Sequence, residues 1–153
     1  MAKLLTTELF DDFTVEEATI DTFNTFTIDG RIHKEFFKNS DDTEDIPDSE
    51  FSQWSSIRPI ALNLIKGRHT PLGFKFILHL GDDMKLSVLE KSDMDISPEQ
   101  ISLGISIKFS QGEVIITTGV SYSIFTLDKS AEKAWDEYIP SFLESNGIEA
   151  DLL

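Results

Sequence analysis

The chain has 153 residues and a formal net charge of −15, from 28 Asp and Glu against 13 Lys and Arg. It holds no cysteine, which excludes disulfides, thiolate nucleophiles and sites in which cysteine binds zinc or an iron–sulfur cluster. Its length is that of one ordinary domain and 40% of its residues are hydrophobic, so we expect a single globular domain over residues 1–153.

The first part of the chain predicts a helix followed by a hairpin. Apolar residues recur at helical spacing within residues 3–13, which indicates a short amphipathic helix. Residues 15–28 alternate as a strand does, and the Asp29-Gly30 dipeptide that follows favours a type I′ hairpin turn. We therefore predict that the chain turns at Asp29-Gly30 and returns along residues 31–37.

An acidic loop and a helix are predicted next. Residues 39–50 are polar, acidic and interrupted by proline, which is typical of a mobile loop. Residues 51–66 carry an apolar stripe at helical spacing, and Pro59 either kinks this helix or begins a second one. Gly67 follows Lys66 as a helix-ending glycine in the left-handed conformation.

A strand and two helix starts are predicted beyond this point. Residues 73–80 alternate with phenylalanine and leucine on one face, as in a strand that is at least half buried. Asp82 or Asp83 is placed to cap a helix that runs to Leu89. The sequence Ser97-Pro98-Glu99-Gln100 then predicts a capping box with proline at the first helical position.

A second hairpin is predicted from residues 105–109 and 114–125, which flank a turn at Gln111-Gly112. Gly119 lies inside its long second strand and is expected to mark a bulge. The arrangement repeats that of the first part of the chain, where a helix also precedes a hairpin, and this is a weak sign of internal duplication.

The last helix follows Asp128, which is expected to cap it, and its apolar residues keep helical spacing as far as Leu143. Pro140 should bend this helix. Because strands arrive as hairpins separated by helices, the sequence predicts an α+β fold. We expect a largely antiparallel sheet built from two hairpins plus an additional strand, packed with about four helices including the C-terminal amphipathic helix.

Charge is segregated along the chain. Residues 51–81 hold four basic residues and no Asp or Glu, which leaves 9 Lys or Arg against all 28 Asp and Glu, a net charge of −19, on the rest. A basic turn of this kind favours an anion, because side chains and backbone N–H groups can both donate to it. The predicted anion- or partner-binding residues are Arg58, Lys66, Gly67, Arg68, His69 and Lys75. The alternative is that these groups only cap a helix end and balance the acidic loop.

Other site chemistries find little support in the sequence. The acidic residues 41–50 lack the spacing of a calcium loop, and His33, His69 and His79 have no partner at metal-ligand spacing. A Gly-x-Ser-x-Gly elbow and a phosphate-cradling glycine loop are both missing from the sequence. We therefore expect no metal, no cofactor and no catalytic residue, and the sequence favours a protein that is not an enzyme.

Three stretches carry a family resemblance: residues 22–30, residues 64–72, and residues 125–130 together with Trp135-Asp136-Glu137. In these the chain resembles an uncharacterised domain-of-unknown-function family of short single-domain proteins from Firmicutes. The resemblance implies a bacterial cytoplasmic protein and supplies no catalytic residue.

Three functions stay open at this point. The first is a non-enzymatic binding or adaptor domain that meets a protein partner or a small anion through Lys66, Arg68, His69 and Lys75. The second is a sliding-clamp-like or other nucleic-acid-associated domain, which the strong negative charge disfavours. The third is a small enzyme that joins His33 or His79 to a carboxylate in a pocket.

With neither a signal peptide nor an apolar run long enough to cross a bilayer, we expect a cytoplasmic protein without membrane contact. The oligomeric state is left open.

Overall fold

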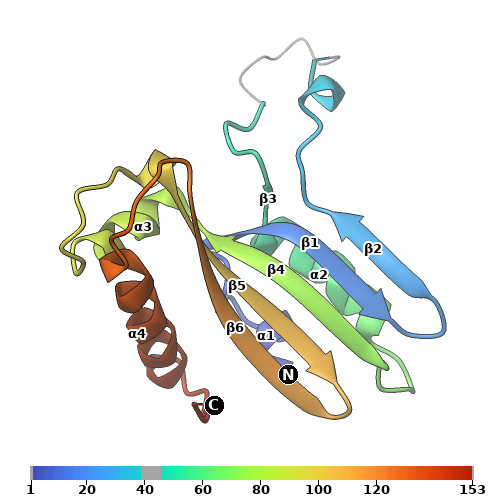
Figure 1. Cartoon of the computed structure of the whole chain (residues 1–153). Helices are drawn as coiled ribbons and strands as arrows, with labels where there is room; N and C mark the ends of the chain where they lie inside the picture. The colour runs from blue at the N-terminus through green and yellow to red at the C-terminus, as the bar shows by residue number, and fades with distance from the viewer. Residues whose placement is uncertain (1, 39–45, 153) are drawn as a thin grey trace.

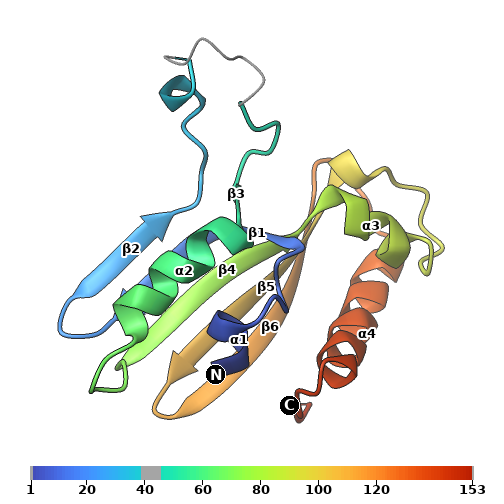
Figure 2. The same cartoon turned by 180° about the vertical axis from the view of Figure 1, so that it is seen from behind.

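A six-stranded sheet carries the α-helices on one of its faces in the computed structural model, which describes residues 2–38 and 46–152 (Figures 1 and 2). The α-helices are α1 (Ala2–Thr6), α2 (Trp54–Ile65), α3 (Asp82–Leu89) and α4 (Ser130–Ser145), and two 3-10 helices are η1 (Lys34–Phe36) and η3 (Pro98–Gln100). The strands are β1 (Phe13–Asp21), β2 (Thr25–Asp29), β3 (Ser52–Gln53), β4 (Gly73–Leu80), β5 (Ile101–Ser110) and β6 (Glu113–Tyr122).

The strands follow the order β2-β1-β4-β5-β6, and the short β3 pairs with β1 beside this path. Each pairing of these strands is antiparallel. The α+β class, the antiparallel sheet and the C-terminal helix are therefore confirmed. The two long hairpins β1–β2 and β5–β6 lie at the two sides of the sheet, with β4 between them.

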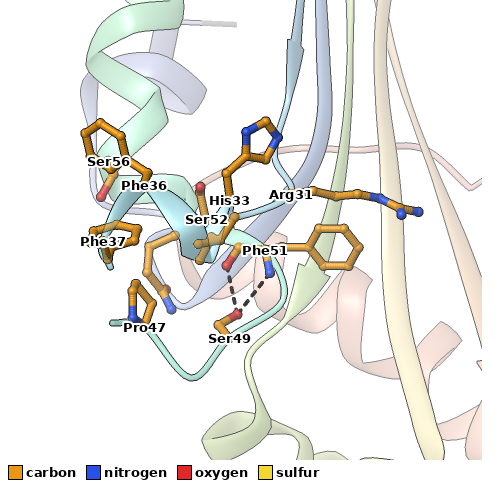
Figure 3. A pocket seen from close by; sticks show the side chains of 11 residues that line it. Arg31, His33, Phe36, Phe37, Pro47, Ser49, Phe51, Ser52 and Ser56 are labelled. Carbon is orange, nitrogen blue, oxygen red and sulfur yellow. Dashed lines mark hydrogen bonds between the residues drawn. The ribbon is translucent and has the colours of Figure 1, made fainter. Parts of the chain in front are cut away.

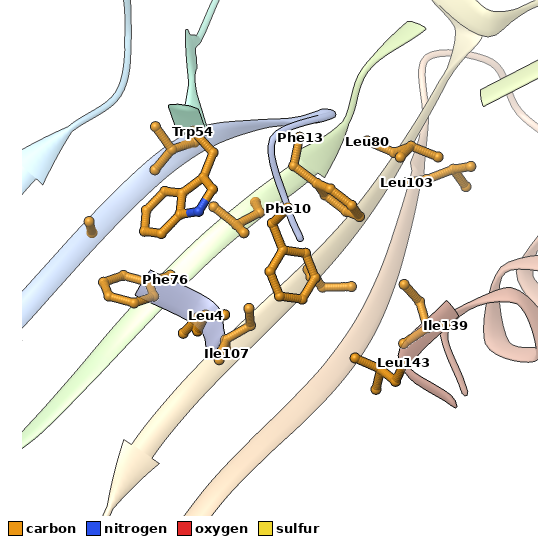
Figure 4. Close-up of a cluster of buried hydrophobic side chains, with 14 of the residues drawn as sticks. Leu4, Phe10, Phe13, Trp54, Phe76, Leu80, Leu103, Ile107, Ile139 and Leu143 are labelled. Atoms are coloured by element: carbon orange, nitrogen blue, oxygen red, sulfur yellow. The ribbon is translucent and has the colours of Figure 1, made fainter. Parts of the chain in front are cut away.

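The core lies between the sheet and the helices (Figure 4). Alternate residues of β4 and β5, such as Phe76 and Ile107, point toward α1 and α2 and are fully buried. From α4, Trp135 packs against Phe13 with ring centroids 6.4 Å apart, and its Nε1 donates to the carbonyl oxygen of Gly104 at 2.9 Å. The strand alternation of period two therefore leaves every other residue on the opposite face.

That opposite face, here called the bare face, is covered by no helix of the described chain (Figure 1). It is built from the residues that alternate with the core residues along the strands, and these are mostly small and polar. They include Glu17, Thr19 and Asp21 of β1, Lys75, Ile77 and His79 of β4, Ser102, Gly104, Ser106 and Lys108 of β5, and Ile115, Thr117, Gly119 and Ser121 of β6. A two-layer α+β fold with one open sheet face results.

The first hairpin turns at residues 22–24, so the prediction of a turn at Asp29-Gly30 is wrong. β1 and β2 pair from Asp21 opposite Thr25, and the Thr25 hydroxyl donates to Oδ1 of Asp21 at 2.7 Å. This register sets Phe26 opposite Ile20 and Ile28 opposite Ala18 on the core face, and packing β2 against the buried Ile20 and Ala18 outweighs the local preference of Asp-Gly for a turn.

Gly30 has a different role, because the chain passes very close to β1 there. A Cβ atom at this position would lie 1.7 Å from the carbonyl oxygen of Val15, and the Gly30 N–H donates to the carbonyl oxygen of Glu16 at 2.8 Å. Only glycine fits such a close approach of two backbones. The predicted return strand 31–37 is absent from this part of the chain, which instead forms one bridge between Arg31 and Phe51 and then η1.

Two helix predictions also change. The first helix ends at Thr6 rather than at residue 13, because Phe13 begins β1 opposite Leu80 and long-range pairing overrides the helical spacing. α2 is one helix that contains Pro59, and Lys66 beyond it is extended, with φ −68° and ψ 140°. Gly67 has no left-handed φ, so its predicted helix-ending conformation is wrong.

Several local predictions are confirmed. Gln111 and Gly112 have φ of 53° and 78°, as a type I′ turn requires. The N–H of Ser97 donates to Oε1 of Gln100 at 3.2 Å, as in the predicted capping box. Asp128 lies two residues before α4, and its carboxylate accepts the N–H of Ser130 at 2.9 Å.

The remaining local predictions either differ from the structure or fall on residues outside the described ranges. Gly119 marks no bulge, since β5 and β6 pair without a register shift and Gly119 lies opposite Gly104. Gly81, not Asp82 or Asp83, stands at the N-terminal cap of α3, and both aspartates lie in its first turn. The predicted acidic mobile loop 39–50 falls largely on residues 39–45, which lie outside the described residues. Among the described helices, none has the length and apolar character needed to cross a membrane.

Candidate functional site

The structure separates the basic residues that the sequence grouped. Arg58 of α2 lies on the helix side of the sheet and is only 18% exposed at its side chain. Its Nε and Nη2 atoms donate to Oδ1 and Oδ2 of Asp11, each at 3.3 Å. Arg58 is thus neutralised by an internal carboxylate and is not free to receive an external anion.

Lys66, Gly67, Arg68 and His69 lie together in the loop between α2 and β4, and each is exposed. None of the three charged or titratable side chains makes a hydrogen bond or ion pair with a described residue. A Cβ atom at Gly67 would meet nothing within 4 Å, so the loop forms no close cradle there. Their role as an anion- or partner-binding turn stays a prediction.

Lys75 lies apart from this loop, on the bare face, where it meets a second lysine. The register of β4 and β5 sets Lys75 directly opposite Lys108, and both side chains are exposed. Neither lysine forms an ion pair within the described chain. Like charges directly opposite each other destabilise a sheet, so this pair is a local cost to the fold in a protein that is otherwise strongly acidic.

A hollow of about 320 Å³ lies beside Lys75 on the bare face. Gly104 of β5 and Gly119 of β6 face each other across the strands and line its centre. Around them stand hydrogen-bonding side chains from three strands, and the residues that line the hollow include no Asp or Glu. These polar neighbours are Lys75, His79, Ser102, Ser106, Thr117 and Ser121.

The two glycines differ in their reason for being small. A Cβ atom at Gly104 would lie 3.2 Å from Nδ1 of His79, so this glycine makes room for the imidazole ring. A Cβ atom at Gly119 would meet nothing within 4 Å, and its φ is not left-handed. Glycine inside a strand costs stability, roughly 0.5–1 kcal/mol relative to alanine. Neither packing nor backbone geometry requires glycine at 119, and its lack of a side chain leaves the hollow open there.

His79 is held at the edge of the hollow by contacts from three directions. Its Nδ1 and the Ser102 hydroxyl are hydrogen bonded at 2.8 Å, and its Nε2 lies 3.7 Å from Oε1 of Glu16. The Phe51 ring stacks on the imidazole at a centroid distance of 5.5 Å. The structure therefore brings His79 to a carboxylate, as the third functional hypothesis requires, although Glu16 itself does not line the hollow.

His33 occupies a different pocket, of about 430 Å³, between the segment around η1 and the start of α2 (Figure 3). Its walls are mainly apolar, from Phe36, Phe37 and Phe51, and no Asp or Glu is among the lining residues. His33 is therefore not joined to a carboxylate there. Across residues 2–38 and 46–152, no three His, Asp or Glu side chains gather as a set of metal ligands.

Sequence reasoning missed Lys108 and the serines of β5. The signal was present as an alternation of small polar residues, Ser102, Gly104 and Ser106, opposite the alternation Thr117, Gly119 and Ser121. Such a pattern also describes any half-exposed strand. Only the strand register shows that Gly104 and Gly119 lie opposite each other.

The model of one protein family matches residues 3–151, nearly the whole chain. The chain belongs to DUF5721, a family of unknown function. The expected resemblance to a domain-of-unknown-function family is thereby confirmed, and membership of DUF5721 assigns no activity to the hollow or to the basic loop. Comparison with curated proteins and with solved structures finds no match.

Proposed function

We propose that this protein is a binding domain that takes a small organic anion in the hollow of its bare face. The observation that carries the proposal is Gly119, a glycine that the fold does not need and that keeps the hollow open. The sequence-based hypothesis of a binding module is kept, but its site moves from the Gly67 turn to the surface around Lys75.

The chemistry of the hollow favours an anion. Lys75 brings a positive charge, Lys108 adds a second one beside it, and no lining carboxylate opposes them. The hydroxyls of Ser106 and Thr117, which face each other across β5 and β6, are placed to donate to anion oxygens. An anion between the two lysines would relieve their mutual repulsion, which gives the site a direct source of binding energy.

The size and polarity of the hollow narrow the class of ligand. A volume of about 320 Å³ is at the small end of ligand pockets, and five of its lining residues carry hydroxyls. A carboxylate or phosphate group attached to a small body with hydroxyls of its own would match this lining. Sugar phosphates and hydroxy acids are of this kind.

The experiment is a thermal-shift screen against inorganic phosphate, citrate, glucose 6-phosphate and adenosine monophosphate, followed by calorimetry. A ligand present at ~100 times its dissociation constant is expected to stabilise the protein by about 2.7 kcal/mol. Gly119→Val should fill the hollow and abolish the stabilisation. It should itself fold, because a Cβ at 119 meets no neighbour and β-branched residues suit strands.

A matched control separates the two candidate sites. The double variant Lys66→Ala with Arg68→Ala removes two charges from the loop but leaves the hollow intact, and it should bind as the natural chain does. Loss of binding in this variant, with binding retained in Gly119→Val, would return the site to the loop. No stabilisation by any of the four anions would contradict the proposal.

A second candidate function rests on the contacts of His79. Its position between the Ser102 hydroxyl and Glu16, at the edge of the hollow, is an arrangement that can pass a proton from serine to imidazole. Hydrolysis of p-nitrophenyl acetate or p-nitrophenyl phosphate tests it. Turnover that disappears in both His79→Gln and Ser102→Ala would support an enzyme, and equal background rates in all three proteins would exclude hydrolysis of these substrates.

We further propose a cytoplasmic location. The chain contains no cysteine, which fits a reducing compartment, and its acidity keeps it dispersed in solution. Fractionation of cells that carry a tagged full-length protein tests this. Recovery with the membrane fraction after a high-salt wash would contradict it.

A further inference from the structure

β6 is an outer strand of the sheet, and the backbone groups on its outer side have no partner within the described chain. Because Gln111 and Gly112 form a two-residue turn, Ser110 and Glu113 are a hydrogen-bonded pair, and the pairing alternates from there. The hydrogen bond from the Ser123 N–H to the carbonyl oxygen of Gln100 agrees with this alternation of hydrogen-bonded pairs. The N–H and C=O groups that point away from β5 therefore belong to Val114, Ile116, Thr118, Val120 and Tyr122.

This edge lacks the features by which proteins usually prevent strand addition. Residues 114–122 contain no charged residue and no proline, and β6 pairs without a bulge along ten residues. Charges, prolines, bulges and short length are the common means of protecting an edge strand. The opposite outer strand, β2, has only five residues and ends at Asp29. The exposure of a long unprotected edge is thus specific to β6.

Apolar side chains extend this edge beyond the end of the strand. Phe125 is 90% exposed and Leu127 is 84% exposed, in the segment that leads from β6 to α4. Side chains of this size are costly to leave in water, and an exposed apolar patch next to a free strand edge is typical of a protein-binding surface. We refer to β6 and residues 123–127 together as the β6 edge.

Carboxylates from α4 flank the β6 edge on the helix side of the sheet. The Thr118 hydroxyl donates to Oδ1 of Asp136. Burial raises the pKa of the Tyr122 phenol, and Glu132 lies close enough for its charge to raise that pKa further. Neither carboxylate forms an ion pair within the described chain. Thr118 and Tyr122 are residues whose backbone groups point outward, so a strand added here would run beside both acidic groups.

We propose that the β6 edge accepts an extended basic segment of a partner protein as an additional strand of the sheet. The outward backbone groups supply the hydrogen bonds, and Lys or Arg at alternate positions of the segment meets Asp136 and Glu132. A second copy of this chain is a poor occupant, since each copy carries a net charge of −15 and antiparallel pairing of two β6 strands would bring the acidic groups of both α4 helices together. The proposal does not depend on the anion hollow.

The test uses a fluorescent peptide, about nine residues long, in which Lys alternates with Val, to match the length of the edge. Its binding is measured by anisotropy, with a peptide of alternating Glu and Val as the control. Val120→Pro removes one outward N–H and leaves the bonds to β5 in place, which edge strands tolerate. We expect this variant to bind the Lys peptide more weakly, by up to roughly tenfold. Val120→Ala should bind the peptide as the natural chain does.

Charge attraction alone is distinguished by the same variants, because a purely electrostatic complex would survive Val120→Pro. Equal affinity of Val120→Pro and Val120→Ala, or no binding of the Lys peptide, would overturn the proposal.

Amide hydrogen exchange of the natural chain tests the same proposal without mutation. The N–H groups of Ile116, Thr118 and Val120 should exchange fast in the free protein and become protected by the peptide, and unchanged exchange would also overturn it. A dimer in sedimentation that Val120→Pro dissociates would assign the edge to self-association instead.

Discussion

The guanidinium group of Arg58 contacts both carboxylate oxygens of Asp11, with its Nε 3.3 Å from Oδ1 and its Nη2 3.3 Å from Oδ2. Its Nη1 also donates to the carbonyl oxygen of Leu5 at 3.5 Å. The pair joins α2 to the segment between α1 and β1, on the helix side of the sheet. A residue that looks in the sequence like part of a basic binding surface is therefore part of the fold.

Arg58→Ala is expected to lower the free energy of unfolding by about 1–3 kcal/mol, because a partly buried carboxylate loses charge-assisted hydrogen bonds. Asp11→Asn should have a smaller effect, and the double variant should cost less than the two single losses added together. Urea unfolding measures all three. Arg68→Ala is the matched control, with an expected change within about 0.5 kcal/mol. Equal effects of Arg58→Ala and Arg68→Ala would show that the pair contributes nothing.

Lys85 is expected to be needed for stability although it carries charge into the protein. Its Nζ donates to the carbonyl oxygens of Ile101 at 2.8 Å and Pro98 at 3.1 Å, and it lies 2.9 Å from Oδ1 of Asp82. Lys85→Met keeps an unbranched side chain but leaves both carbonyls without this donor, at a cost of about 1–3 kcal/mol.

The measurement is again urea unfolding, with the exposed Lys91→Met as control. A Lys85→Met protein as stable as the natural chain would mean that water replaces the lost donor at both carbonyl groups.

Gly30→Ala is expected to destabilise the protein by several kcal/mol, since the new methyl group would lie 1.7 Å from the Val15 carbonyl oxygen. The backbone of β1 or of the segment after β2 has to move to accept it. Gly67→Ala is the control, because its methyl group meets nothing within 4 Å, and it should change stability by less than about 1 kcal/mol. Thermal unfolding followed by circular dichroism compares the two, and similar melting temperatures would contradict the close approach at Gly30.

The two tyrosines are expected to lose their protons later than tyrosine in a peptide. Burial raises the pKa of Tyr138 above its ordinary value of 10.0, with the charge of Asp12 acting in the same direction. Burial also raises the pKa of Tyr122, with further contributions from Glu132 and Asp128. The phenolate absorbance of the folded protein should therefore rise at higher pH than that of the unfolded chain.

The sign of the stability effect follows from linkage. Because both folded-state pKa values are raised, the unfolded chain releases these protons first, so stability is fully present below pH 10.0 and falls as the pH rises through the folded-state pKa values. Unfolding at a series of alkaline pH values measures this fall. Tyr138→Phe should reduce its slope, and an unchanged slope would show that Tyr138 does not contribute.

How far the fold was predictable differs between elements, and the two hairpins show why. Gln111-Gly112 turns as predicted because its residues need only their own backbone preferences and the strands beside them. Asp29-Gly30 has the stronger turn signal but does not turn, since Phe26 and Ile28 of β2 must face the same core as Ile20 and Ala18 of β1. Pairing with a distant part of the chain decides between two local options.

The candidate site was predictable only in part, for the same reason. Lys75 was identified from its charge, and His79 was named as one of two histidines that a carboxylate could join. Lys75 lies opposite Lys108, His79 is hydrogen bonded to Ser102, and Gly104 lies opposite Gly119, and each of these pairs joins two different strands.

Composition and local pattern were sufficient for the fold class, the C-terminal helix and the capping box at Ser97. These depend on residues close together in sequence, whose periodicity and capping chemistry are readable without a partner. The tertiary structure alone decided that Arg58 pairs with Asp11, that Gly30 passes against β1 and that the hollow opens over Gly119. Each of these depends on strand register and helix packing, which are set by burying the whole core at once rather than by any short segment.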